Sequence, residues 1–410
     1  MRGLRHGAFF ACTGINTTTL KEMKFMATAV KTKSGIKIVV KDPSRFKDKV
    51  VQVADACPDS NALPLLTCMK IEVRAGSVVF TGGDGINTIC VGEQDVVEAD
   101  QDASFVVPAA LFSSIIKKLP AGKVELTKKD GESLLIKAGS AKFDLSLFNG
   151  DEFPQIPTDK NVESEFKIPA SSLVAGLKST MYAAAEESKQ ESKNMPVLTG
   201  VNMEMAAGET NLKFTGTDRN RLSRFLVEGI QAQPFRQTIA VSSCKEIVKI
   251  IDSVQQEVKV TVTQSVISIT GPGFMIVSKF LEGNYPDTDK VIPRKFEMEV
   301  VLEREKLLAV LTRTSVFAKT KKMGIFTLKD DQMSIFSKTE IGQVAEGLDC
   351  QTVGKEMRLG LDVFFLIDAI KAVDHKEIRL SFTSPTTPVA IRPDNETNKV
   401  IGVIIPIRLN

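Results

Sequence analysis

One arrangement of segments occurs three times along this chain, and it constrains the fold more than any other feature. A short apolar strand, a Pro, Ser or Asp that opens a helix, and about three turns of apolar residues at helical spacing occupy 105–120, 239–253 and 359–373. A pattern that returns in the same order at intervals of more than a hundred residues predicts repeated domains rather than one large core.

The neighbouring segments repeat as well. Paired strands are expected after each of these helices, at 123–139, 257–273 and 377–393. Another strand pair is expected before each, at 69–85, 202–218 and 324–340. An earlier helix completes each unit, at 42–57, 169–188 and 303–319. We therefore predict an α+β protein of three similar β-rich domains, each with two helices.

Two proline-bearing breaks separate the three copies. The segments 148–157 and 281–293 each follow an apolar strand with glycine, an aromatic residue, proline and acidic residues, a composition typical of connectors. The expected boundaries are an N-terminal extension at 1–34 and domains at 35–157, 158–293 and 294–410.

Composition indicates an ordinary globular chain with no long apolar run. The six cysteines have no CxxC spacing, which favours reduced thiols in a cytoplasmic setting. The two histidines, His6 and His375, are too few for a metal cluster. We expect no metal, no cofactor and no membrane partner.

The first 25 residues differ from the rest, with four basic residues and one acidic residue. The run AFFAC weakly matches a signal-peptide core, and the segment also resembles a transit peptide. A third interpretation, which we favour, is upstream translation with a start at Met26, because KEM at 21–23 is compatible with a ribosome-binding sequence. Without this segment the chain carries no net charge, so a polyanion partner would need a local arrangement of cations.

An enzyme would need a nucleophile or a metal. The stretch SSCK at 242–245 matches S-x-x-K formally, but no Ser-Asp-Asn or Lys-Thr-Gly element accompanies it. Ser242 also occupies the position that opens a helix in the repeat, so we expect it to cap that helix. The glycine-rich stretches 81–85 and 271–273 lack the context of a phosphate loop and are expected to be hairpin turns. We predict a protein that is not an enzyme.

Five segments, in this order and on this repeat, resemble the bacterial sliding clamp, the beta subunit of DNA polymerase III. They are NALPLLTCMKIEV (61–73), VPAALFSSIIKKLP (107–120), TGTDRNRLSR (215–224), LEGNYPDTDKVIP (281–293) and VIIPIRL (403–409). The resemblance covers about residues 35–409 and implies a DNA-clamp fold in which one chain forms half of a ring.

The resemblance implies a head-to-tail homodimer, with the first domain of each chain against the third domain of the other. Matching positions place Phe143 and Leu145 on one side of this seam and Val316 and Phe317 on the other. The ring would enclose duplex DNA without reading its sequence, and basic residues on the inner helices and at the rim would face the phosphates. These DNA-facing candidates are Arg45, Lys49, Lys117, Lys178, Lys245, Lys319, Lys321 and Lys322.

The resemblance also implies a pocket between the second and third domains. It would receive a short peptide of the type glutamine-leucine-x-leucine-phenylalanine from the replicative polymerase, the clamp loader and repair proteins. The pocket positions are Leu198, Thr217, Arg221, Leu222, Pro286, Val291, Pro388, Val403, Ile405, Pro406, Ile407 and Arg408. Aliphatic and proline walls of this kind suit leucine and phenylalanine anchors.

Several positions depart from the family pattern. Arg219 and Asn220 stand where the family commonly has glycine and histidine, so partner preference is expected to differ. Pro388 replaces a serine of some members, and Asn410 extends the chain by one residue. The alternative to a ring is a repeat scaffold that binds protein partners without enclosing DNA.

Overall fold

The computed structural model describes residues 35–74, 76–129, 133–157, 161–394 and 399–409. The extension 1–34, with the alternative start at Met26, and the terminal Asn410 lie outside these described residues. The described residues fold into two compact units: those of 35–157 together with Ser268–Ser278, and those from 161 to Ile267 together with those from Lys279 to Leu409. We refer to them as unit 1 and unit 2.

Unit 1 is built from antiparallel sheets and a pair of helices. One sheet has the strand order β5-β1-β7-β8-β9, and β17 pairs with β4 in a second run of order β17-β4-β3-β2-β6. The strands are β1 (Ile36–Val40), β2 (Cys68–Arg74), β3 (Ser77–Gly83), β4 (Asn87–Glu93), β5 (Val97–Ala99), β6 (Ala103–Pro108), β7 (Val124–Lys129), β8 (Ser133–Ala138), β9 (Ala141–Ser146) and β17 (Phe274–Lys279). The helices α2 (Pro43–Ala54) and α3 (Ala109–Lys118) pack side by side.

The two helices of unit 1 begin in different ways. The Asp42 carboxylate caps α2 by accepting hydrogen bonds from the backbone N–H groups of Ser44 and Arg45, at 3.1 and 3.0 Å. In contrast, α3 follows directly from β6, and no side chain caps it. Each helix buries an apolar stripe that includes Phe46 on α2 and Phe112 on α3.

Unit 2 contains a nine-stranded sheet of order β14-β11-β12-β13-β26-β25-β24-β18-β22 and a four-stranded sheet of order β21-β20-β19-β23. The first strands along the chain are β10 (Val162–Pro169), β11 (Gly200–Met205), β12 (Leu212–Thr217), β13 (Arg221–Val227), β14 (Phe235–Ala240) and β15 (Glu257–Thr263), followed by β16 (Val266–Gly271), which crosses the unit boundary. The later strands are β18 (Met298–Glu303), β19 (Met323–Lys329), β20 (Gln332–Lys338), β21 (Gln343–Asp349), β22 (Gln351–Gly354), β23 (Met357–Asp362), β24 (Glu377–Phe382), β25 (Val389–Pro393) and β26 (Val400–Ile404).

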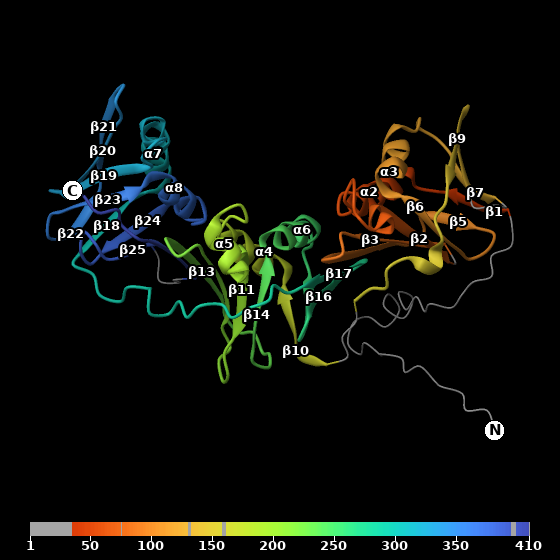
Figure 1. Ribbon diagram of the computed structural model, residues 1–410, viewed down its shortest axis with the longest axis horizontal. Coiled ribbons are helices and arrows are strands. Elements are labelled where there is room, and N and C mark those ends of the chain that lie inside the picture. The colour runs from red at the N-terminus through yellow and green to blue at the C-terminus, as the bar shows by residue number, and fades with distance from the viewer. Residues whose placement is uncertain (1–34, 75, 130–132, 158–160, 395–398, 410) are drawn as a thin grey trace. The chain divides into compact units, whose positions relative to one another are not determined.

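Helices pack in pairs in unit 2 as well. The pairs are α4 (Ala170–Met181) with α6 (Val241–Ile251), and α7 (Arg304–Ala318) with α8 (Val363–Lys371). In Figure 1, α4 and α6 lie side by side above β11 and β14, which they contact. A short helix, α5 (Gln190–Asn194), was not expected from the sequence. The repeated two-helix, multi-strand plan is the one that the sequence predicts.

One local prediction was wrong. Ser242 does not cap α6: the N-cap residue is Ala240, and no side chain accepts a hydrogen bond from the first turn. The helix continues directly from β14, as α3 continues from β6, so the strand itself fixes the start of the helix. By contrast, Asp362 caps α8 by accepting from the N–H groups of Phe364 and Phe365.

Unit 2 consists of two modules, one with α4 and α6 and one with α7 and α8, and the two share apolar packing. Tyr182, which follows α4, and Phe225 on β13 pack against the buried cluster formed by β18 to β26, α7 and α8. Strand β13 also pairs with β26, so backbone hydrogen bonds join the two modules in one sheet.

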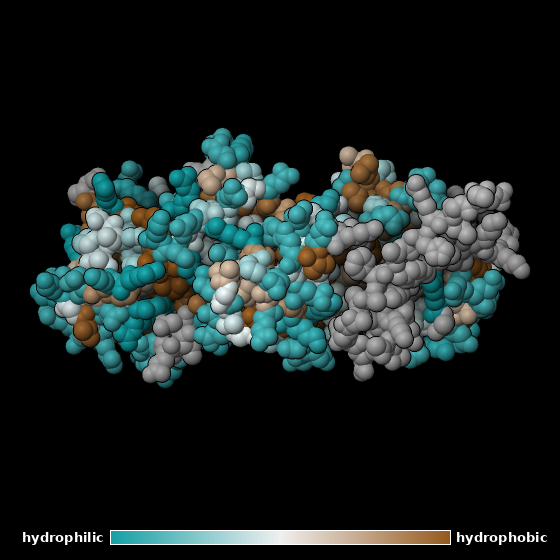
Figure 2. Space-filling model, turned by 90° about the horizontal axis from the view of Figure 1, so that it is seen from below, coloured by the Kyte–Doolittle hydropathy of each residue, from teal (hydrophilic) through white to brown (hydrophobic). Residues whose placement is uncertain are grey.

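On the face of the molecule shown in Figure 2, hydrophilic side chains predominate and brown hydrophobic patches are separated by them.

Two further expectations concern thiols and membranes. Cys57, Cys68, Cys90, Cys244 and Cys350 are free thiols. Of the helices in the described ranges, none is both long enough and apolar enough to cross a bilayer.

Candidate functional site

A pocket of about 240 Å³ opens in unit 2 where the β12–β13 hairpin, the connector after Tyr285 and the end of β26 meet. Its floor is apolar: Leu222 and Val403 face each other in the register of β13 and β26, and both are at most 2 % exposed. Val291 and Ile405 lie higher on the wall, and their exposed fractions are 39 % and 41 %. The pocket therefore offers an apolar floor and accessible apolar walls.

The turn between β12 and β13 is held in place by its own side chains. The Thr217 hydroxyl donates to the Arg221 carbonyl at 2.7 Å and accepts from the Arg219 N–H at 3.1 Å. The Asp218 carboxylate accepts from the backbone N–H groups of Asn220 and Arg221, each at 2.9 Å. Ile405 then donates its N–H to the Asn220 carbonyl at 2.9 Å, which ties the end of β26 to the turn.

Arg221 lies beneath this turn and connects the two modules of unit 2. Its guanidinium donates to the Asp218 carboxylate at 3.1 Å and to Asp368 on α8 at 2.8 Å. It stacks over the Phe365 ring, 4.3 Å from the centroid, and the Tyr182 ring lies 5.7 Å away. Burial of the Tyr182 hydroxyl raises its pKa to about 12, although Ser223 and Arg221 act in the opposite direction.

The connector forms the opposite wall and is fixed by two arginines of the sheet. Arg224 bonds to the Thr288 hydroxyl at 2.7 Å and to the Asp289 carboxylate at 2.6 Å. Burial disfavours the charged form of Asp289, but the Arg224 guanidinium outweighs this and lowers the pKa of that carboxyl. Arg236 donates to the Pro286 carbonyl at 3.0 Å. The wall is therefore held in place by contacts within the chain.

Seven of the residues that the sequence assigned to a partner pocket come together here. They are Thr217, Arg221, Leu222, Pro286, Val291, Val403 and Ile405. The lining also contains Arg219, Asn220, Asp287 and Thr288. In the sequence, Arg219 and Asn220 stood out only as departures from the family pattern. Asp287 and Thr288 belong to the connector segment identified there, but no residue type marked them as wall residues.

The other five assigned residues do not line this cavity. Leu198 is buried in a small cluster with Ala185, Val197 and Tyr285. Ile407 donates its N–H to the Gly360 carbonyl at 2.8 Å. Pro406 is buried, Arg408 is exposed, and Pro388 is half-buried before β25.

The basic residues assigned to DNA fall into two groups. Arg45 and Lys49 on α2 both pair with Glu93, the second at 3.5 Å, and Lys178 on α4 pairs with Asp252 at 2.8 Å. Lys117, Lys245, Lys319, Lys321 and Lys322 are exposed and make no ion pair within the described part of the chain. The last three follow the end of α7.

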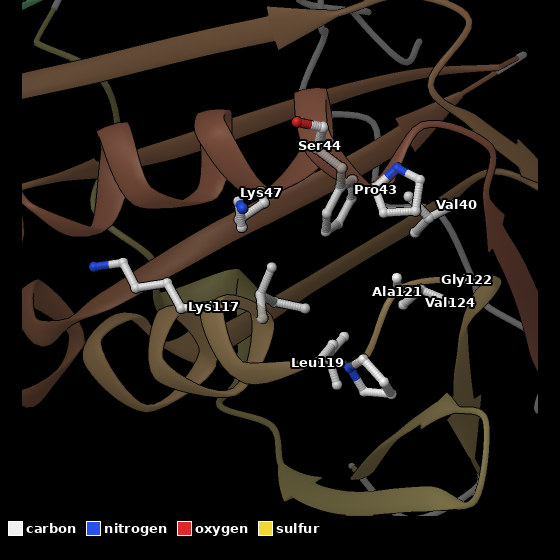
Figure 3. A pocket seen from close by; sticks show the side chains of 12 residues that line it. Val40, Pro43, Ser44, Lys47, Lys117, Leu119, Ala121, Gly122 and Val124 are labelled. Atoms are coloured by element: carbon white, nitrogen blue, oxygen red, sulfur yellow. The ribbon is translucent and has the colours of Figure 1, made fainter.

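A second cavity, of about 410 Å³, lies in unit 1 between the start of α2 and the end of α3. Figure 3 shows Lys47 on α2 and Lys117 on α3 at one side of this cavity, with Val40, Pro43 and Val124 at the other. Two cations on neighbouring helices create a local basic surface that net charge does not reveal.

The residues assigned to a dimer seam lie on or beside edge strands. Strand β9 ends one sheet of unit 1, and β21 ends the four-stranded sheet of unit 2. On β9, Phe143 is 36 % exposed while Leu145 is 5 % exposed and packs into its own unit. At the end of α7, Val316 is 59 % exposed and Phe317 is half-buried.

Family models match the chain in three successive parts. They describe the N-terminal, central and C-terminal domains of the DNA polymerase III beta subunit, at residues 36–157, 168–287 and 289–408. The beta sliding clamp of Bacillus subtilis (strain 168) is 29 % identical over 378 residues, which are 89 % of this chain and 97 % of the relative.

Solved structures agree with this match. The DNA polymerase sliding clamp of Bacillus subtilis superposes with a TM-score of 0.84 at 28 % identity, covering 92 % of this chain and all of the other. The beta subunit of Streptococcus pyogenes DNA polymerase, at 23 % identity and a TM-score of 0.85, has the same fold, with 91 % of this chain and all of the other covered. The molecule is thus a three-domain protein of the α+β clamp fold.

The chain belongs to the bacterial sliding clamp family, the beta subunits of DNA polymerase III.

Proposed function

We propose that this clamp encloses duplex DNA as a head-to-tail homodimer and tethers the replicative polymerase, the clamp loader and repair proteins through the pocket of unit 2. The observation that carries the tethering role is the apolar pocket at the β13–β26 junction. In this role the protein is a processivity factor without a catalytic step, and it acts in the cytoplasm.

Peptide binding follows from the chemistry of the pocket. Leucine and phenylalanine anchors would pack on Leu222 and Val403, and each would contribute roughly 1.5–3 kcal/mol before ordering costs. Two such anchors together supply roughly 3–6 kcal/mol, less than the ~8 kcal/mol that corresponds to a micromolar Kd, so successive partners could exchange. Fluorescence anisotropy with a labelled peptide Gln-Leu-Ser-Leu-Phe tests this, and Leu222→Asp should abolish binding. Unchanged affinity in that variant would contradict the assignment.

Self-association would use the edge strands. Pairing of β9 in one chain with β21 in another would satisfy backbone groups that otherwise invite uncontrolled aggregation. Phe143 and Val316 would then contribute apolar contacts at the seam, next to Leu145 and Phe317. We expect Phe143→Asp and Val316→Asp to sediment as monomers. Val353→Asp, at a residue 72 % exposed on β22, is the matched control and should remain a dimer.

DNA would be held by topology and weak electrostatics. The exposed lysines Lys117, Lys245, Lys319, Lys321 and Lys322 would attract phosphates over a distance, whereas Arg45, Lys49 and Lys178 are partly neutralised by their carboxylate partners. Weak contacts suit sliding because each must break as the ring moves.

The second candidate is a scaffold that binds proteins without enclosing DNA, and the same pocket supports it. Sedimentation separates the two: a ring requires a stable dimer, whereas a scaffold can be monomeric.

A further inference from the structure

Arg219 stands at the edge of the pocket in a backbone conformation that arginine rarely adopts. Its φ of 75° lies in the left-handed region, where glycine and asparagine fit with less strain. The hydrogen bonds of Thr217 and Asp218 fix the turn on both sides of it. The backbone of Arg219 is thus held in place by the turn, and its side chain is exposed.

The other arginines around the pocket are already engaged. Arg221 is held by Asp218 and Asp368, and Arg224 is held by Thr288 and Asp289. For the Arg219 side chain, no hydrogen bond or ion pair is present with any residue that the structure describes. Its guanidinium is therefore the one in the pocket lining that remains available to a ligand within the described chain.

The carboxylates near the pocket do not cancel this charge. Asp287 also lines the pocket, but Lys290 lies 3.7 Å from it, and both side chains are more than half exposed. Asp289 is bound to Arg224. The rim therefore has a free guanidinium at the hairpin and a screened carboxylate at the connector, so charge is distributed unequally around an apolar floor.

We propose that Arg219 selects partner peptides that carry a carboxylate beside their apolar anchors. This rests on the proposed peptide-binding function and adds a charge preference to it. A guanidinium presents paired donors that match a carboxylate, and its planar fork reduces the ordering required for each hydrogen bond. The leucine and phenylalanine anchors would supply most of the affinity, and Arg219 would distinguish one partner from another.

The test uses the full chain and pairs of fluorescent peptides that differ only by Asp or Asn. The pairs place this residue at the variable position of Gln-Leu-x-Leu-Phe, before the glutamine, or after the phenylalanine. In at least one pair we expect the Asp peptide to bind about two- to fivefold more tightly at low salt. The preference should decrease as salt rises.

Substitutions then assign the preference to its source. Arg219→Gln should make the two peptides equal, Arg219→Lys should keep part of the preference, and Arg219→Glu should favour a Lys peptide over the Asp peptide. Arg358→Gln, at an exposed arginine on β23, is the matched control and should leave the preference unchanged.

The outcomes separate the two proposals. Equal binding of Asp and Asn peptides in all three pairs, or a preference that survives Arg219→Gln, would overturn the proposed role of Arg219 but would leave the peptide pocket in place. Absence of binding by every peptide would overturn the peptide pocket and, with it, this proposal.

Discussion

Replacement of Arg221 by glutamine should lower the free energy of unfolding of unit 2 by about 3 kcal/mol. The guanidinium is buried, with its side chain 8 % exposed, and its partner Asp218 is 3 % exposed. Removing one member of a buried pair leaves the other charge without its partner, which costs about 3–5 kcal/mol. Two backbone N–H groups still bond to Asp218 in the variant, so we expect the lower end of this range.

The second partner of Arg221 provides an internal comparison. The Asp368 side chain is 42 % exposed, so solvent screens its interaction with Arg221. Asp368→Asn should therefore cost only about 0.5–1 kcal/mol. The double variant Arg221→Gln with Asp218→Asn should recover part of the stability because it removes the unpaired buried carboxylate.

The composition of the chain supplies a suitable probe. It contains no tryptophan and two tyrosines, Tyr182 and Tyr285, both in unit 2. Urea unfolding followed by tyrosine near-ultraviolet circular dichroism thus reports the unit that contains Arg221. A loss below about 1 kcal/mol for Arg221→Gln, or equal losses for Arg221→Gln and Asp368→Asn, would refute this account of the junction.

Three other predictions concern packing and ionisation. Gly216→Ala should destabilise unit 2 by about 1–3 kcal/mol, because a Cβ there would lie 2.2 Å from the Thr180 carbonyl oxygen, whereas Gly347→Ala meets nothing within 4 Å and should change the urea midpoint little. Cys244, whose pKa burial raises to about 12, should resist iodoacetamide at pH 8 until the protein unfolds; rapid labelling detected by peptide mass spectrometry would contradict its burial. Tyr182 should remain un-ionised at pH 11 in the native protein, because burial raises its pKa to about 12. Its contribution to the free energy of unfolding is therefore complete below pH ~10, the pKa of tyrosine in the unfolded chain, and is lost as the pH rises toward about 12. An absorbance of the native protein at 295 nm that already increases near pH ~10 would contradict this.

The repeat was the most predictable feature of the fold. The apolar spacing at 105–120 predicted a strand followed by the helix α3, and the spacing at 359–373 predicted a strand followed by the helix α8. Both could be predicted because alternation and helical periodicity are local properties of the sequence. Ser242 was misread because serine is a common cap, whereas here β14 leads directly into α6. Local residue type could not reveal that the preceding strand sets the helix start.

The site was predictable where its residues belong to recognisable segments. Leu222 and Val403 were identified together although they are far apart in sequence, and they pair across β13 and β26. The ion pairing of the basic residues on the helices was not predictable. Arg45 is paired with Glu93 on β4, and no local pattern marks a carboxylate that distant in the chain as its partner. Similarly, Leu198 is apolar and near a turn, but tertiary packing buries it in a cluster with Tyr285, and it is not part of the pocket lining.

Retention on circular DNA shows whether this protein encloses the duplex. The protein, loaded on a nicked circular duplex by a clamp loader and separated from free protein by gel filtration, should remain bound to the circle. Cutting that circle once with a restriction enzyme should release it, because a ring without tight contacts slides off a free end. Equal retention on circular and cut DNA, or binding to neither, would contradict a clamp that encloses its substrate.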